Sequence, residues 1–208
     1  MSAHCCPSQE PKQGNSHQGR YRKILWIALI VNIAMFAVEV ISAMQAASVS
    51  LLADSLDFLG DAANYAISLW VLGLGLAIRA KASLLKAISM AAFGLWVLGS
   101  AIWHFVTGVI PSAETMGVIG IIALVANLGV AALLYTYREG DSNMRSVWLC
   151  TRNDAIGNVA VILAAIGVFG TGAAWPDLIV AIIMASLALY TSWSVIKHAR
   201  AELTSACE

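Results

Sequence analysis

The chain has 208 residues, of which 60% are hydrophobic and only 12% are charged. A soluble domain would be about half apolar and about a quarter charged, so this composition favours a membrane protein over a soluble one. The formal net charge is zero, so the chain as a whole offers no electrostatic reason to bind nucleic acid.

Long apolar runs predict six membrane-spanning helices, each at least about 20 residues long and so able to cross the hydrocarbon layer. In chain order we expect them at Ile24–Met44, Val49–Ile78, Ser83–Thr107, Met116–Tyr137, Met144–Gly170 and Leu178–His198. Turn-forming residues separate several runs, as in VIPSAE after the third and REGDSN after the fourth. A soluble helical bundle would need a polar outer face, which these runs lack. The sequence therefore predicts an all-α membrane protein with six transmembrane helices.

The basic residues indicate the orientation of these helices. They gather before the first run, around the connections after the second and fourth, and at the end of the sixth: Lys12, Arg20, Arg22 and Lys23; Arg79, Lys81 and Lys86; Arg138 and Arg145; Lys197 and Arg200. Connections rich in Lys and Arg stay in the cytoplasm, so both termini are expected there. We expect a flexible cytoplasmic tail over residues 1–22, a six-helix domain over 23–199 and a short cytoplasmic tail over 200–208.

The second run carries three carboxylates on one helical face. Asp54, Asp57 and Asp61 are three and four residues apart, and such offsets return to the same face. Asn64 and Ser68 continue the stripe. A charged Asp at mid-membrane costs roughly 2.5–3.5 kcal/mol. Hydrogen bonding between helices explains a lone Asn or Ser, but three like charges need protons or a cation between them. We interpret the stripe as a functional site.

Polar residues inside two other runs repeat this pattern. Asn32 and Glu39 are seven residues apart in the first run and so share a face, while Cys150, Asp154 and Asn158 follow at steps of four in the fifth. The second and fifth helices therefore resemble a pseudo-repeat, because each places a possible ligand four residues before an Asp-Ala pair. Internal repeats of this kind in transporters point to a binding site at their interface.

Three further features leave alternatives open. His4, Cys5 and Cys6, with His17, offer soft-metal ligands, although a tail without a site is the simpler interpretation. The four cysteines show no disulfide framework in their spacing. Arg152 points away from Cys150 and Asp154 and either reaches the cytoplasmic surface or pairs with an acid such as Glu39.

The segment NIAMFAVEVISAMQAASVSLLADSLDFLGD (32–61) resembles the signature of the cation diffusion facilitator family. That signature has an Asn and a Glu in its first helix, a Ser after the first loop, and then an Asp beside a small residue and a ligand four residues before an Asp. The segment NDAIGNVAVILAAIGVFGTGAAWPDLIVAIIMASLALYTS (153–192) is similar to the end of the family's membrane domain, including its Trp-Pro-Asp turn. The resemblance covers about residues 20–200.

The resemblance implies export of a divalent metal in exchange for protons, through a four-ligand site between the second and fifth helices. Matched residue by residue, it implies Asp57, Asp61 and Asp154 as metal ligands and Asp54 as a non-ligand. The remaining position is usually His or Asp in the family, and it is Cys150 here.

Cys150 leaves the choice of metal open. Three Asp ligands alone suit Mg²⁺ or Mn²⁺ as well as Zn²⁺, whereas a thiolate favours Zn²⁺ or Cd²⁺. If Cys150 packs as a neutral residue, Asn158 supplies the fourth oxygen. We expect Zn²⁺ or Cd²⁺ as the substrate, with Mn²⁺, Co²⁺ or Fe²⁺ as alternatives, and no cofactor.

The family usually has a soluble ferredoxin-like domain after the sixth helix. Only ARAELTSACE follows His198 here, so we expect a short member without that domain. Its homodimer would form through the membrane domain. Its expected partners are divalent metal ions, protons and the lipid bilayer, and its expected location is a bacterial inner membrane.

Ionised carboxylates facing the cytoplasm would bind the cation, because ligands must be deprotonated. Protons would compete with it on the outer side, and rocking of the helices would give alternating access. A passive cation channel is the alternative. We expect no enzymatic activity, because the runs contain no H-E-x-x-H or similar acid–base arrangement.

Overall fold

The computed structural model describes residues 15–70, 76–137 and 142–205. Within these ranges all regular structure is helical, which confirms the expected all-α architecture. The elements in chain order are α1 (Asn15–Ala46), α2 (Val49–Trp70), α3 (Leu76–Thr107), α4 (Ala113–Leu134), the short 3-10 turn η1 (Tyr135–Tyr137), α5 (Ser142–Thr171) and α6 (Trp175–Ser205).

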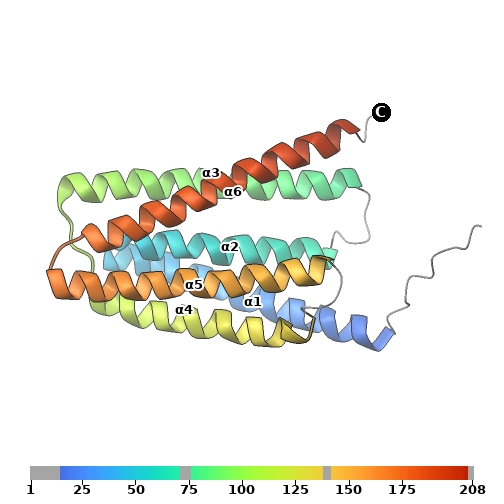
Figure 1. Cartoon of the computed structure of the whole chain (residues 1–208), viewed down its shortest axis with the longest axis horizontal. Helices are drawn as coiled ribbons and strands as arrows, with labels where there is room; N and C mark the ends of the chain where they lie inside the picture. The colour runs from blue at the N-terminus through green and yellow to red at the C-terminus, as the bar shows by residue number, and fades with distance from the viewer. Residues whose placement is uncertain (1–14, 71–75, 138–141, 206–208) are drawn as a thin grey trace, which may run out of the picture.

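The helices lie side by side along the long axis of the molecule (Figure 1). Three pairs pack most extensively: α1 with α2, α4 with α5, and α3 with α6. The pair α3 and α6 forms a separate layer, in which α6 crosses α3 at an angle (Figure 1). Because α2 also packs against α3, α5 and α6, it is the central helix, and most of its residues are buried.

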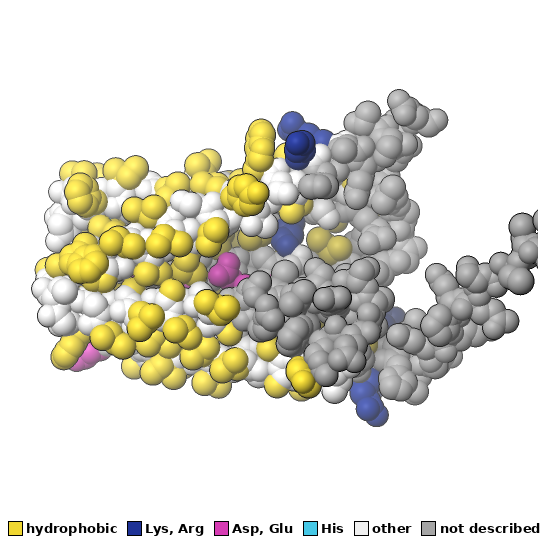
Figure 2. Space-filling model, in the orientation of Figure 1, with side chains coloured by type: hydrophobic (Ala, Val, Ile, Leu, Met, Phe, Trp, Pro, Cys, Tyr) yellow, Lys and Arg dark blue, Asp and Glu magenta, His cyan; other side chains and the backbone are white. Residues whose placement is uncertain are grey.

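Hydrophobic side chains cover much of the described part of the face shown in Figure 2. Large side chains such as Phe105 and Phe169 are 77% and 78% exposed, which suits contact with lipid rather than water. Five helices contain segments long and apolar enough to cross a membrane: Gly19–Ala46, Ala80–Thr107, Ala113–Leu134, Asp154–Thr171 and Trp175–Lys197. The helix α2 differs from them because it carries three carboxylates, and it is also the helix with the most neighbours in the bundle.

One predicted boundary is wrong. The second run was expected to extend to Ile78, but α2 ends at Trp70 and Ile78 belongs to α3, which begins at Leu76 rather than Ser83. The sequence VLGLGLAI (71–78) is apolar throughout, so hydropathy gave no boundary before Leu76. Glycines with low helix propensity were the local signal. The other five expected runs each overlap the corresponding helix.

Two glycines end helices at the end of the bundle opposite the start of α1 and the end of α6 (Figure 1). Gly108 follows α3 and Gly172 follows α5, with φ of 67° and 62°. Their N–H groups donate to the carbonyl oxygens of His104 and Val168, at 2.9 and 2.8 Å. This left-handed cap is typical of glycine, and it lets the chain turn back so that α6 runs antiparallel to α5.

Candidate functional site

The first turn of α2 is held by a carboxylate from α6. The Oδ1 atom of Asp177 accepts hydrogen bonds from the hydroxyls of Ser48 and Ser50 at 2.7 and 2.6 Å. The backbone N–H of Val49 donates to Oδ2 at 2.9 Å and that of Ser50 to Oδ1 at 3.0 Å. The carboxylate is fully buried. It satisfies amide groups that a helix N-terminus leaves unpaired and complements the helix dipole, so it sets the position of α2 relative to α6.

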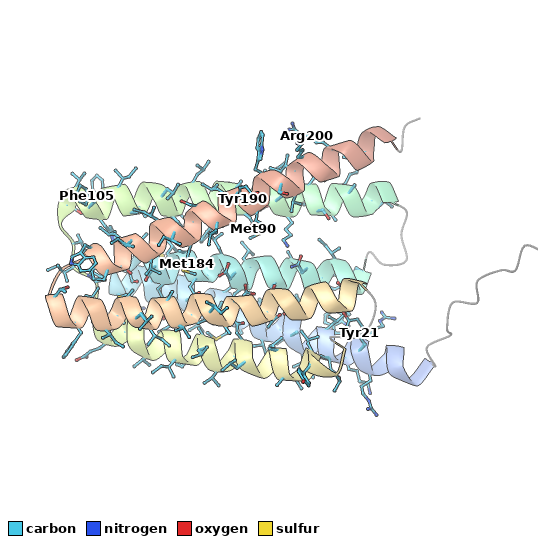
Figure 3. The ribbon with its side chains drawn as sticks, in the orientation of Figure 1. Tyr21, Met90, Phe105, Met184, Tyr190 and Arg200 are labelled. Carbon is cyan, nitrogen blue, oxygen red and sulfur yellow. The ribbon has the colours of Figure 1, made fainter. Side chains whose placement is uncertain are left out.

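The structure places the carboxylates of α2 against α5 at a glycine. A Cβ atom on Gly157 would lie 3.3 Å from Oδ2 of Asp57 and 3.5 Å from Oδ1 of Asp54. It would also lie 3.2 Å from the terminal methyl group of Met184, which comes from α6 and is labelled in Figure 3. Gly157 therefore allows close approach of α5 to both carboxylates, whereas a larger residue would crowd them.

Asp61 is held by two hydroxyl groups. Tyr65 and Thr151 each donate a hydrogen bond to its Oδ2 atom at 2.8 Å, and the two hydroxyl oxygens are 2.6 Å apart. Asp154 on α5 also lies within hydrogen-bonding reach of Asp61. The donors fix the orientation of the carboxylate and stabilise its charge. Because both hydroxyl groups donate to Oδ2 of Asp61, neither of them donates to its Oδ1 atom.

Sequence reasoning missed the roles of Tyr65, Thr151 and Asp177. Tyr65 lies one helical turn after Asp61, and helical offset could have found it. Thr151 lies on another helix, 90 residues along the chain from Asp61. Asp177 lies 127 residues from Ser50, and only the serines before the apolar run hinted at a helix start there.

A lysine approaches the site from α3. The Lys86 ammonium donates a short hydrogen bond to Oδ1 of Asn64, and its charge also acts on Asp61. The sequence had placed Lys86 in the connection between the second and third runs, and this placement is wrong because α3 already begins at Leu76. The side chain is half-buried and reaches the carboxylate stripe of α2.

A second group of polar residues adjoins Asp54. With its amide turned to satisfy both ends, Asn158 donates to Oδ2 and Oδ1 of Asp54 at 2.6 and 3.1 Å and accepts from Nδ2 of Asn127 at 2.8 Å. Asn158 was the alternative fourth metal ligand, and here both ends of its amide are engaged by Asp54 and Asn127. Asn32 and Glu39, expected on one face of the first helix, are both fully buried.

The remaining predicted ligand lies outside the described side chains. The backbone of Cys150 is part of α5, but its side chain and that of Arg152 are not among those the structure describes. The side chains of His4, Cys5, Cys6 and His17 also lie outside those that the structure describes. The proposed role of Cys150 therefore stays a prediction.

Asp57, Asp61 and Asp154 line the α2–α5 seam without converging on one point. Among the described residues, no three His, Cys, Asp or Glu side chains are close enough together to hold one ion. Asp61 and Asp154 are neighbours, whereas Asp57 lies beside Gly157. Like-charged carboxylates repel at short range, so a common site for a cation requires these side chains to move together.

Comparison with known proteins identifies related transport proteins. Residues 25–204 match the sequence profile of the cation efflux transmembrane domain. The chain is 28% identical over 203 residues to a cadmium, cobalt and zinc/H(+)-K(+) antiporter of Bacillus subtilis, covering 88% of this chain and 63% of that protein. It is 26% identical to the metal cation efflux system protein CzcD of Cupriavidus metallidurans and 27% identical to the zinc transporter ZitB of Escherichia coli, covering 88% of this chain and 62% of each relative.

The chain thus spans less than two thirds of the length of these relatives. The profile match, in contrast, extends over most of the chain and includes all six helices described here. Both the match and the apolar helices indicate several passes through a membrane. The chain belongs to the cation efflux, or cation diffusion facilitator, family and is a multi-pass membrane protein.

Proposed function

We propose that this chain exports a divalent metal cation, Zn²⁺ or Cd²⁺, in exchange for protons. The observation that carries this proposal is the carboxylate-lined seam between α2 and α5 inside a largely apolar bundle. Buried acids are costly in a membrane and are retained where they bind ions or protons. The names of the bacterial relatives, which refer to zinc, cadmium and cobalt, support the same class of substrate.

The cargo would be bound by Asp57, Asp61, Cys150 and Asp154. Asp61 is already oriented by its hydroxyl partners, and Asp57 and Asp154 would move toward it when a cation neutralises their mutual repulsion. Ionised ligands bind the cation on the cytoplasmic side, and inward movement of protons drives its release on the other side. The metal is the transported substrate, and we propose no cofactor and no enzymatic step.

We also propose six membrane spans, with both termini in the cytoplasm and residues 23–199 as the transporter domain. The described Lys and Arg side chains lie toward the end of the bundle where α1 begins and α6 ends (Figure 2), which is the distribution expected of a cytoplasmic side. The buried α2, surrounded by four helices, would cross with them because its carboxylates face protein. The bacterial relatives support an inner-membrane location, and a homodimer through the membrane domain is the assembly that the family resemblance implies.

Reconstitution tests this function directly. Purified protein in proteoliposomes should transport Zn²⁺ and Cd²⁺ faster when protons flow down their gradient in the direction opposite to the metal. Each metal ion transported should be accompanied by proton movement the other way. Asp57→Ala, Asp61→Ala and Asp154→Ala should each abolish this flux, whereas Glu114→Gln, an exposed acid at the start of α4, should not. Metal flux that ignores the gradient and moves no protons would instead identify a passive channel. Faster transport of Mn²⁺, Co²⁺ or Fe²⁺ would reassign the cargo.

A further inference from the structure

Glu39 places a carboxyl group inside the bundle from α1. It is fully buried, and among the residues that the structure describes neither of its carboxyl oxygens has a hydrogen-bond partner. An ionised carboxylate is unfavourable in such a place unless it is paired or receives hydrogen bonds. Glu39 is not one of the four residues assigned to the metal. It lies on α1, whereas those four lie on α2 and α5.

The group that Glu39 faces is another acid. Its side chain lies against the carboxyl group of Asp54 on α2, which is also fully buried. Asp54 differs from Glu39 because the Asn158 amide donates to both of its oxygens, and Asn158 is held in turn by Asn127. Donors on Asp54 favour its ionised form. A proton on Glu39 would then donate to Asp54, which satisfies both acids at once.

Among the side chains that the structure describes, no charged group on the neighbouring helices neutralises this pair. Asp57 is the other acid that acts on Glu39, Lys86 reaches Asn64 and Asp61, and Asp177 is occupied at the start of α2. The other described acids on the packed helices are Asp61 on α2, Asp154 on α5 and Glu114 on α4, and no described Lys or Arg acts on Glu39 or Asp54. Since no described basic group balances the charge of Glu39 and Asp54, a proton is the cation that would do so.

We propose that Glu39 and Asp54 form a proton-binding site, separate from the metal ligands, whose single shared proton is the one exchanged for the metal. This rests on the metal–proton exchange proposed above and assigns its proton to specific residues. Loss of the proton converts an O–H···O hydrogen bond between the two groups into contact between two anions, which repel. The proton leaves to water, and no bond other than O–H is broken.

The geometry also couples this site to the metal ligands. A Cβ atom at Gly157 would lie within 3.5 Å of both Oδ1 of Asp54 and Oδ2 of Asp57, so both carboxylates approach the same point of α5. A cation at Asp57 favours ionisation of the pair beyond Asp54, because the positive charge offsets the added negative one. By linkage, release of the proton favours metal binding to the same degree.

A transport experiment separates proton exchange from metal binding. The variants are Glu39→Gln and Asp54→Asn, with Glu114→Gln as the matched control at an exposed acid. In proteoliposomes with a trapped pH dye, wild type and control should couple Zn²⁺ entry to proton exit, whereas proton exit in Glu39→Gln should fall about tenfold or more. By calorimetry, Glu39→Gln should still bind Zn²⁺, but its affinity should lose the pH dependence that release of this proton gives wild type, and ⁶⁵Zn²⁺/Zn²⁺ exchange without a pH gradient should persist.

Three results would overturn the assignment. Undiminished proton exit in Glu39→Gln would place the proton elsewhere, and lost Zn²⁺ binding in this variant would make Glu39 part of the metal site. Infrared difference spectroscopy on wild type needs no variant, and adding Zn²⁺ should remove a protonated-carboxyl C=O band. Absence of such a band over the whole titration with acid would also refute the shared proton. If wild type moves no protons with the metal, the exchange itself fails, while the acid titration still decides whether the pair holds a proton.

Discussion

Asp177 and Ser50 join the beginnings of α6 and α2, since Oδ1 of Asp177 accepts from both the backbone N–H and the hydroxyl of Ser50, at 3.0 and 2.6 Å. The helix that carries the carboxylate stripe is thereby anchored to the α3–α6 layer at one end. Further along the chain, its side chains meet α5 and α1 through Asp61 and Asp54. Because α2 is anchored at one end and carries ion-binding groups further along, a small tilt of α2 would move these groups.

The anchor should matter for stability. Asp177→Ala leaves the first amide groups of α2 and the Ser48 and Ser50 hydroxyls without their acceptor, and it should lower the apparent Tm in detergent by roughly 3–10 °C. Asp177→Asn keeps one acceptor oxygen and should lose less. Ser50→Ala, which removes one of the bonds but keeps the backbone contact, is the graded control. Equal melting temperatures for wild type and Asp177→Ala would show that the cap does not stabilise the fold.

The hydroxyl partners of Asp61 should tune metal affinity. Tyr65→Phe and Thr151→Val each remove one hydrogen bond to Oδ2 with little change in volume, and each should weaken Zn²⁺ binding by about 10–100-fold, the usual effect of losing a partner that orients a ligand. Calorimetric titration of the purified variants measures this. Tyr135→Phe, at an exposed tyrosine, is the control. Unchanged affinity in both Tyr65→Phe and Thr151→Val would remove Asp61 from the binding step.

Gly157 should resist even a small substitution. The added methyl group of Gly157→Ala would contact Met184 and the carboxylates of Asp57 and Asp54 at 3.2–3.5 Å, so these groups must shift by a few tenths of an ångström. Transport should fall while the protein still folds. Gly129→Ala is the matched control, because a Cβ at Gly129 meets nothing within 4 Å. Equal Zn²⁺ flux in the two variants would show that the α2–α5 seam tolerates separation.

Cys150 should set metal selectivity. A thiolate adds soft-metal preference to three hard oxygen ligands, so Cys150→Ser should weaken Cd²⁺ binding more than Zn²⁺ binding. Cys150→Asp should shift preference toward Mn²⁺, and Cys150→His should favour Zn²⁺ over Cd²⁺. Competition of Cd²⁺ against Zn²⁺ in the Ser variant measures the effect. An unchanged ratio would mean that Cys150 only packs.

The amino-acid sequence by itself determined the helices and the carboxylate stripe. Hydropathy and the 3.6-residue period are local properties, so the sequence predicted that Asp54, Asp57 and Asp61 share one face of a helix. The same locality explains the error at Ile78, because an unbroken apolar run contains no hydropathy boundary. It also explains why Lys86 was assigned to a connection.

Only the tertiary structure decided which residues complete the site. Thr151 reaches Asp61 from α5, Asn158 links Asp54 to Asn127, and Asp177 caps α2 from the far end of the chain. These partners are distant in sequence, and each meets its acid because the packing of α2 between α1, α5 and α6 brings them together. Periodicity places a side chain on a face of its own helix, but the helix that covers that face depends on the packing of the whole bundle.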